Sequence, residues 1–404
     1  MGVTSAAFPA SLPATAARLG DSPARLLPGI SVLFGGLLAG VLVVSALRPR
    51  TAPRLLAAGA VLQAAALLGL AAAPDLAGFY LACAVAGVGF GLAEASGSAL
   101  ARRLAAERTT AALAGLNGAA AVSAAACPLI VAAAVPGALP LALGLLLLVP
   151  LASGALAVWA WPVPRIDPTR PGAKAVPGIE PTRAGPQAVS GIERARRSAK
   201  AGAFGIRRAL AGVLPGGTLL FLFVGTETVF SGWSSVLPLE VLRLSPRTAA
   251  LGTSAFWALM AAGRYLAAAL VRRGVPAGRY LVLGLAAAAG DLAVAAWIGS
   301  SVPGVELALA ALATASLAPG YALILGQALG SVNDDAVQRL TGVLVAAGSA
   351  GGSVIPLAVA LGVGAAIPAL LLTQAVLLLA CAALAGRPGT WRARSAATEA
   401  RLDR

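Results

Sequence analysis

The sequence predicts an all-α membrane protein in which two six-helix bundles are joined by a polar linker. Three observations lead to this prediction. The 404-residue chain is 59% hydrophobic and only 11% charged, whereas soluble domains carry about 25% charged residues. Its apolar residues gather in runs of about 20, which is enough to cross roughly 30 Å of hydrocarbon as a helix. A Ser-Pro pair and several Gly and Ser residues of the first half also recur at a fixed spacing in the second half.

Short charged or Pro- and Gly-rich breaks separate about eleven apolar runs. Within a bilayer the backbone must satisfy its own hydrogen bonds, which favours helices. The alternation over about 10 residues that marks a membrane β-strand is absent. A half-length apolar stretch at 1–17 comes first. We expect full spans at 27–48, 53–73, 77–101, 112–134, 138–161, 211–239, 248–271, 279–299, 305–329, 340–360 and 363–386.

The net charge of +15 does not indicate a nucleic-acid-binding protein, because Lys and Arg lie in the breaks between apolar runs. A segment rich in Pro, Gly, Arg and Ser repeats AVPGIEPTR as AVSGIERAR and cannot form a packed core. The sequence therefore divides into an N-terminal bundle at 1–161, a disordered cytoplasmic linker at 162–207, a C-terminal bundle at 208–386 and a cytoplasmic tail at 387–404.

The distribution of Lys and Arg predicts the orientation in the membrane. If the long linker is cytoplasmic, the cytoplasmic breaks hold most arginines, as the positive-inside rule requires. The external loops keep only Arg18, Arg25, Arg243 and Arg247. We therefore expect a multi-pass plasma-membrane protein with a cytoplasmic C-terminus. The arginines on the cytoplasmic side are Arg48, Arg50, Arg54, Arg102, Arg103, Arg108, Arg272, Arg273, Arg279, Arg339 and those of the C-terminal tail.

Cofactor and metal chemistry finds little support in the residue types present. Cys83, Cys127 and Cys381 all lie inside apolar runs, where they are expected to be small buried hydrophobes. The chain has no His, so a His-based metal site or proton relay is excluded. No Walker A motif occurs, which excludes ATP as the direct energy source. We expect no metal, no cofactor and no enzymatic activity.

An internal repeat relates the two halves of the chain. Ser22-Pro23 and Ser245-Pro246 precede apolar runs, and Ser followed by Pro is a favourable helix start. The run that begins near 211 has its counterpart about a dozen residues before Met1, so the first helix is expected to be truncated. At the same spacing of 223 residues Gly29 matches Gly252, Ser31 matches Ser254 and Gly40 matches Gly263, while Cys127-Pro128 corresponds to Ile355-Pro356.

Six segments, taken in order, resemble helices of the major facilitator superfamily, and in particular its fucose/glucose-permease-like branch. They are GVGFGLAEASGSAL (87–100), LAGLNGAAAVSAAACPLI (113–130), GTETVFSGW (225–233), SAFWALMAAGR (254–264), APGYALILGQ (318–327) and GSAGGSVIP (348–356). The resemblance covers nearly the whole chain. It implies the major facilitator fold and the transport of a small solute.

The sequence departs from the family patterns at two places. In the loop after the second helix, Gly40 and Leu42 match the family pattern, but Val44 replaces its usual Asp. Of the charged residues in that pattern only Arg48 and Arg50 remain. In the fifth helix Ser123 and Cys127 replace two glycines of the antiporter pattern. The second departure favours uptake over efflux.

Four ionisable residues lie well inside the expected spans, away from their ends, where a charge is costly unless function or pairing offsets the cost. Glu227, at mid-span, is expected to carry a proton or bind a solute hydroxyl, and the alternative is a hydrogen bond to a neighbouring helix. Glu94 lies about two turns from Arg102, and the same two interpretations apply to it: a functional carboxyl, or a polar contact with a neighbouring helix. Arg264 is expected to extend toward the cytoplasmic side or to pair with a carboxylate at the cytoplasmic gate. Asp291, in a helix that the resemblance makes peripheral, is expected to pair with Arg264 or another polar group.

Neutral polar and aromatic residues complete the expected solute site. Sugars bind amides through hydrogen bonds and stack on aromatic faces, which suggests Asn117, Tyr321, Gln327 and Trp233. An alternative for Trp233 is a place in the interfacial aromatic belt.

The leading hypothesis is a monomeric secondary transporter that works by alternating access. A proton-coupled symporter for a sugar-like solute is favoured, and a drug or metabolite efflux antiporter is the main alternative. A membrane-embedded transferase would need clustered acidic metal ligands, and only Asp334-Asp335 form an adjacent pair. A non-transporting receptor or scaffold is the remaining alternative.

Overall fold

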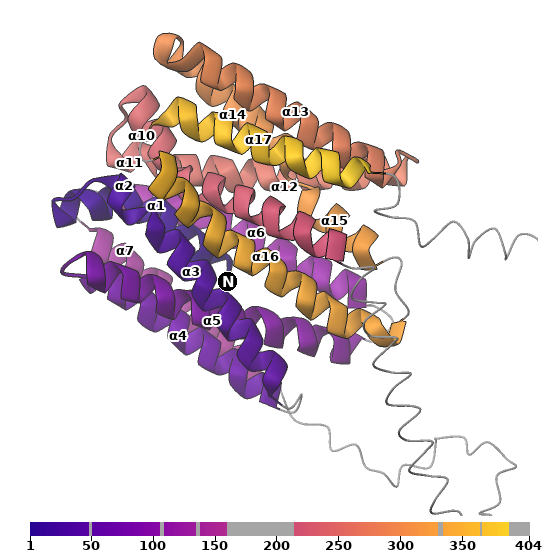
Figure 1. Cartoon of the computed structure of the whole chain (residues 1–404). Helices are drawn as coiled ribbons and strands as arrows, with labels where there is room; N and C mark the ends of the chain where they lie inside the picture. The colour runs from indigo at the N-terminus through magenta and orange to yellow at the C-terminus, as the bar shows by residue number, and fades with distance from the viewer. Residues whose placement is uncertain are drawn as a thin grey trace, which may run out of the picture.

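The computed structural model describes residues 1–47, 51–105, 109–134, 138–159, 214–329, 334–363 and 366–387. In these ranges the chain is helical apart from short connections, and no strand occurs among them (Figure 1). The helices lie side by side in a bundle, with the two halves of the chain on opposite sides.

The first half forms six rods, two of which consist of two consecutive helices. The 18-residue α1 is the helix expected at 1–17, and Leu147 interrupts the last rod. The rods are α1 (Gly2–Leu19), α2 (Pro23–Leu26) with α3 (Pro28–Ala46), α4 (Ala52–Ala72), α5 (Leu76–Ala105), α6 (Thr109–Ala134), and α7 (Leu139–Leu146) with α8 (Leu148–Trp159).

The second half forms six rods as well, and three of them are broken. The breaks fall at Ser234-Ser235, at Ala250 and at Ala318-Pro319. The rods are the helix Leu214–Trp233 with α10 (Val236–Leu242), α11 (Pro246–Ala249) with α12 (Leu251–Arg272), α13 (Ala277–Ile298), α14 (Pro303–Leu317) with α15 (Gly320–Leu329), α16 (Asp334–Val363) and α17 (Ile367–Gly386). A 3₁₀ turn, η3 (Gly299–Ser301), precedes α14.

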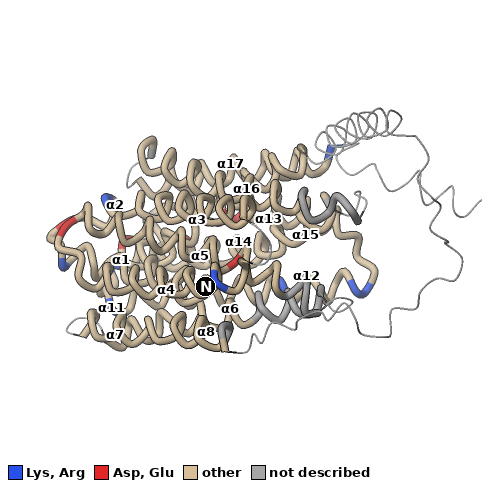
Figure 2. Tube along the Cα trace, turned by 90° about the horizontal axis from the view of Figure 1, so that it is seen from below, with Lys and Arg blue, Asp and Glu red and all other residues tan. Residues whose placement is uncertain are grey.

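Ten of the described segments are long and apolar enough to cross a bilayer, and Ala119–Ala134 is a shorter apolar helix. The spans agree with the sequence prediction to within a few residues. Arg and Lys, with Asp and Glu, lie mainly at the two ends of the bundle (Figure 2). We call the end where α3, α8, α12 and α17 finish the linker end, and the opposite end, with the α1–α2 and α10–α11 connections, the far end (Figure 1).

The internal repeat is visible at both helix starts. Pro23 and Pro246 each begin a four-residue helix that leads into a long one, α3 in the first half and α12 in the second. Ser245 accepts a hydrogen bond from the Thr248 backbone N–H at 3.3 Å, as an N-cap should. Ser22 occupies the N-cap position without a side-chain cap bond.

The repeated glycines perform the same task in each half. A Cβ on Gly40 would collide with the Val88 carbonyl of α5, and a Cβ on Gly263 would collide with the Ala315 carbonyl of α14. Glycine therefore lets α3 approach α5 and α12 approach α14. Small residues commonly permit such close approach between membrane helices.

A seam joins the two halves in the part of the bundle nearer the far end. There α3 packs against α16, and α6 against α12. Ser353 of α16 donates to the Ser31 carbonyl at 3.0 Å, and Ser254 of α12 donates to the Ala125 carbonyl at 2.9 Å. Pro356 and Pro128 follow Ser353 and Ala125 by three residues each, so the two contacts are counterparts in the repeat.

A third seam contact involves the first helix. The Ser235 hydroxyl, at the break before α10, donates to the Pro9 carbonyl of α1. In a regular helix that carbonyl would accept from residue 13. Residue 13 is Pro, which has no N–H, so the other half of the molecule supplies the donor.

Candidate functional site

An ion pair inside the second half forms the centre of the candidate site. Arg264 of α12 contacts Glu227 of the helix Leu214–Trp233, with Nη2 and Oε1 3.2 Å apart. The Glu227 side chain is 16% exposed and that of Arg264 is 35% exposed. Both residues lie well inside membrane spans, so each charge lowers the cost of the other.

The break between α14 and α15 supplies a second partner for Arg264. Its Nε donates to the Ala318 carbonyl at 3.2 Å, at the interruption formed by Ala318 and Pro319. Gly263, next to Arg264, is the residue that lets α12 lie close to α14. Irregular backbone at membrane depth is typical of positions where a chain binds ions or solutes.

Tyr321 and Glu94 bring the two halves together around this pair. Tyr321 is the second residue after the break and interacts electrostatically with Glu94, Glu227 and Arg264. Glu94 comes from α5 in the first half and is partly buried. It also interacts with the amino group of Met1. Carboxyl groups from both halves therefore lie within electrostatic range of one tyrosine, nearer the linker end than the seam.

The sequence was then compared with known proteins. The model of the Major Facilitator Superfamily matches residues 1–356. The chain belongs to the Major Facilitator Superfamily. It is a transporter rather than an enzyme and a multi-pass membrane protein, with ten apolar helices among the described residues. No curated protein matches its sequence significantly.

Solved structures of other transporters have the same fold. A D-xylose-proton symporter aligns with a TM-score of 0.72 at 16% identity, over 96% of this chain and 95% of that one. An auto-inhibited POT family peptide transporter aligns with a TM-score of 0.66 at 14% identity, over 95% and 94%. The nucleoside transporter NupG aligns with a TM-score of 0.65 at 11% identity, over 95% and 96%.

Of the residues singled out from the sequence, Glu227 and Arg264 are in contact, and both lie with Glu94 within electrostatic range of Tyr321. Of the two partners expected for Asp291, Arg264 binds Glu227 and the Ala318 carbonyl instead, and a pairing with another polar group stays a prediction. Asp291 lies partly buried in α13.

Two further candidates lie away from the ion pair. Trp233 is 4% exposed and lies at the seam beside Ile30 and Pro356, so it is not a lipid-facing belt residue. Gln327 points toward α13, since a Cβ on Gly278 would lie 3.2 Å from its Oε1. The side chain of Asn117 and all of Arg48 lie outside the described residues.

One group at the site and one that lies two turns from Arg264 along α12 were missed by sequence reasoning. The first is the Ala318 carbonyl, which the Ala-Pro break inside an apolar run could have indicated. The second is Trp257, whose buried Nε1 has no hydrogen-bond partner in the described part of the chain. It precedes Arg264 by seven residues and so shares a face of α12, a spacing readable from the sequence.

Proposed function

We propose that the protein is a secondary active transporter that carries a small polar solute together with protons. The observation that supports this proposal is the Glu227–Arg264 pair at membrane depth, with Glu94 of the other half within electrostatic range of the same tyrosine. The fucose/glucose-permease-like motifs favour a sugar-like solute. The protein is proposed to act as a monomer in the plasma membrane.

Glu227 is the proposed proton carrier. A proton on its carboxyl removes the charge that holds Arg264, whose Nε keeps its bond to the Ala318 carbonyl. Arg264 then has free N–H groups that can bind a solute hydroxyl. Release of the proton restores the ion pair and displaces the solute, which couples the two events.

The closed seam supports a proposal about which end of the pathway is shut in this state. The hydrogen bonds of Ser254, Ser353 and Ser235 join the halves toward the far end. Glu94, Arg264 and Tyr321 lie nearer the linker end. With the linker end cytoplasmic, as the positive-inside rule favours, the structure corresponds to a state that is closed to the outside.

The test is transport by the purified full-length chain in proteoliposomes. A panel of labelled hexoses, pentoses and nucleosides is offered with and without an inward proton gradient, and solute-driven acidification of the lumen is recorded. We expect one solute class to accumulate only with the gradient. Glu227→Gln should lower gradient-driven accumulation at least tenfold, because an amide keeps the shape but cannot titrate.

Glu240→Gln is the matched control. Glu240 is 39% exposed and pairs loosely with Arg243 at the far end, so the same substitution should leave accumulation within twofold of the parent. The proposal would be wrong if Glu227→Gln still accumulated solute against its gradient with unchanged pH dependence. Outward transport of solute driven by the proton gradient would instead identify an efflux antiporter.

A further inference from the structure

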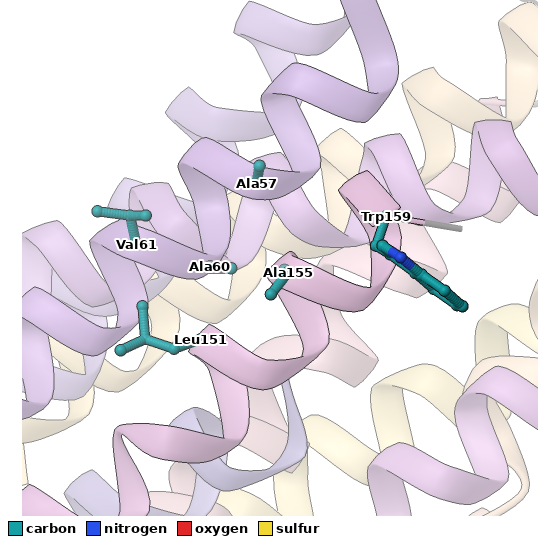
Figure 3. A pocket seen from close by; sticks show the side chains of 7 residues that line it. Ala57, Ala60, Val61, Leu151, Ala155 and Trp159 are labelled. Carbon is teal, nitrogen blue, oxygen red and sulfur yellow. The ribbon is translucent and has the colours of Figure 1, made fainter. Parts of the chain in front are cut away.

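A groove on the outer surface of the first half lies apart from the central site. It has a volume of about 620 Å³ and runs between α4 and α8 near the linker end. Figure 3 shows Val61 and Leu151 facing each other toward one end, with Ala57, Ala155 and Trp159 toward the other. The full lining is Ala57, Ala60, Val61, Leu151, Gly154, Ala155 and Trp159.

The groove owes its depth to small residues on both helices. A Cβ on Gly154 would press against Ala60, so the two helices touch at the floor. Ala57 and Ala155 leave space above that contact. Val61 and Trp159 are 57% and 83% exposed, so the groove opens toward the surface that faces the bilayer. Its side chains offer no carboxylate, amide or hydroxyl to a polar solute.

One basic residue lies on the α4 face that lines the groove, at its linker end. Arg54 is exposed and precedes Ala57 by three residues and Val61 by seven, which puts it on the same face of α4. No acidic residue occurs in the sequence between Asp21 and Asp75. Trp159 ends α8 at the same end of the bundle, and tryptophan favours the headgroup region of a bilayer.

We propose that this α4–α8 groove binds an anionic phospholipid, with one acyl chain along the groove and the headgroup at Arg54. Moving an acyl chain from the bilayer into an apolar groove exchanges one apolar surrounding for another. Selectivity must therefore come from the headgroup, which an arginine at the mouth supplies. Basic pockets between membrane helices on the cytoplasmic side bind acidic headgroups in this way.

Native mass spectrometry of the full-length protein tests the proposal. The purified chain is titrated with phosphatidylglycerol and with phosphatidylcholine of identical acyl chains. We expect one phosphatidylglycerol to be retained at least fivefold more tightly than phosphatidylcholine. Arg54→Gln should remove this preference, and Ala155→Phe, which fills the groove, should weaken retention of both lipids.

The linker end of α17 provides matched controls. Arg387 and Ala383 are both exposed there, four residues apart on one face, so Arg387→Gln and Ala383→Phe make the same changes elsewhere on the surface. Neither should alter retention. Equal binding of the two lipids by the parent protein, or equal effects of Arg54→Gln and Arg387→Gln, would overturn the proposal.

Two other outcomes are decisive. If Ala155→Phe abolishes a dimer without changing lipid retention, the groove seats a second copy of the chain and the lipid proposal fails. If Ala155→Phe does not give a monodisperse protein, Arg54→Gln alone decides, because an exposed arginine can be replaced without disturbing the packing.

Discussion

At the scale of single residues, the site depends on how the intramembrane charges are shared. Arg264 contacts both Glu227 and the Ala318 carbonyl through two different nitrogens, Nη2 and Nε. The planar guanidinium holds these donors in fixed directions, whereas the three N–H groups of lysine share one nitrogen. Glu94 has no ion pair among the residues that the structure describes, and its interactions are with Tyr321 and the Met1 amino group. The two carboxyl groups should therefore have different roles.

We predict that Glu94→Gln weakens solute binding without abolishing proton coupling. The amide still offers a hydrogen bond to a solute but loses the charge, so the solute concentration for half-maximal transport should rise about tenfold, equivalent to about 1.4 kcal/mol. The ratio of protons to solute should stay the same. Loss of coupling with unchanged solute affinity would instead make Glu94 the proton carrier.

We also predict that Arg264→Lys is as damaging to accumulation as removal of the charge. A lysine ammonium is a point charge and cannot bridge Glu227 and the Ala318 carbonyl in the same geometry. Accumulation should fall at least tenfold in both Arg264→Lys and Arg264→Gln. Near-parental accumulation by the lysine variant would show that charge alone, and not the bridging geometry, is what the site requires.

The sequence could indicate which residues were chemically unusual at this scale, but not which partners they have. A Glu or Arg inside an apolar run is conspicuous because of its cost in lipid. The pairing of Arg264 with Glu227 instead of Asp291 depends on how α12 packs against its neighbours, which no local pattern reveals. Ala318 contributes to the site through its backbone carbonyl, so the identity of its side chain could not indicate this contact.

At the scale of helices, the seam consists of two equivalent contacts and one exceptional contact. The serine-to-carbonyl bonds of Ser353 and Ser254 join counterpart helix pairs. The repeat of Ser31 with Ser254 was visible in the sequence, but the two take opposite roles, since Ser31 accepts with its carbonyl and Ser254 donates with its hydroxyl. Sequence similarity gave the positions and could not give the direction of the bonds.

We predict that replacing both seam donors, Ser254 and Ser353, by Ala shifts the protein toward the state open at the far end. Each hydrogen bond contributes about 0.5–1.5 kcal/mol, so the double variant should change the ratio of the two states by roughly fivefold or more. Distances between spin labels on α3 and α16 would measure this ratio. Thr373→Ala is the control, because the Thr373 hydroxyl bonds only the Ala369 carbonyl of its own helix.

At the scale of the whole molecule, the sequence predicted the helices well and their interruptions poorly. Periodic apolar runs mark spans because lipid requires them. The breaks at Leu147, at Ser234-Ser235 and at Ala318-Pro319 lie inside the predicted spans, so the positions of the spans alone do not reveal them. Pro319, which has no N–H, marks the last of them, and two of the breaks supply groups to the seam and the ion pair.

Alternating access predicts that a thiol at the seam reacts only when the far end opens. Cys83, Cys127 and Cys381 are buried, so the parent chain should react slowly with a charged maleimide. In Ser353→Cys, labelling from the far end should rise severalfold when solute and protons are supplied. In Ser22→Cys, an exposed far-end position, labelling should be fast and insensitive to solute. Constant labelling at position 353 would contradict alternating access at this seam.

The Pro9 carbonyl has a consequence for the energetics of opening. Its donor, the Ser235 hydroxyl, belongs to the other half, and Pro13 removes the donor within α1. When the halves separate at the far end, this carbonyl would have no hydrogen-bond donor among apolar neighbours, which would cost several kcal/mol. A water molecule must therefore enter as the serine leaves, which makes opening a hydration step. Osmolytes that are excluded from protein surfaces favour burial, so concentrated sucrose should slow turnover by holding the far end shut.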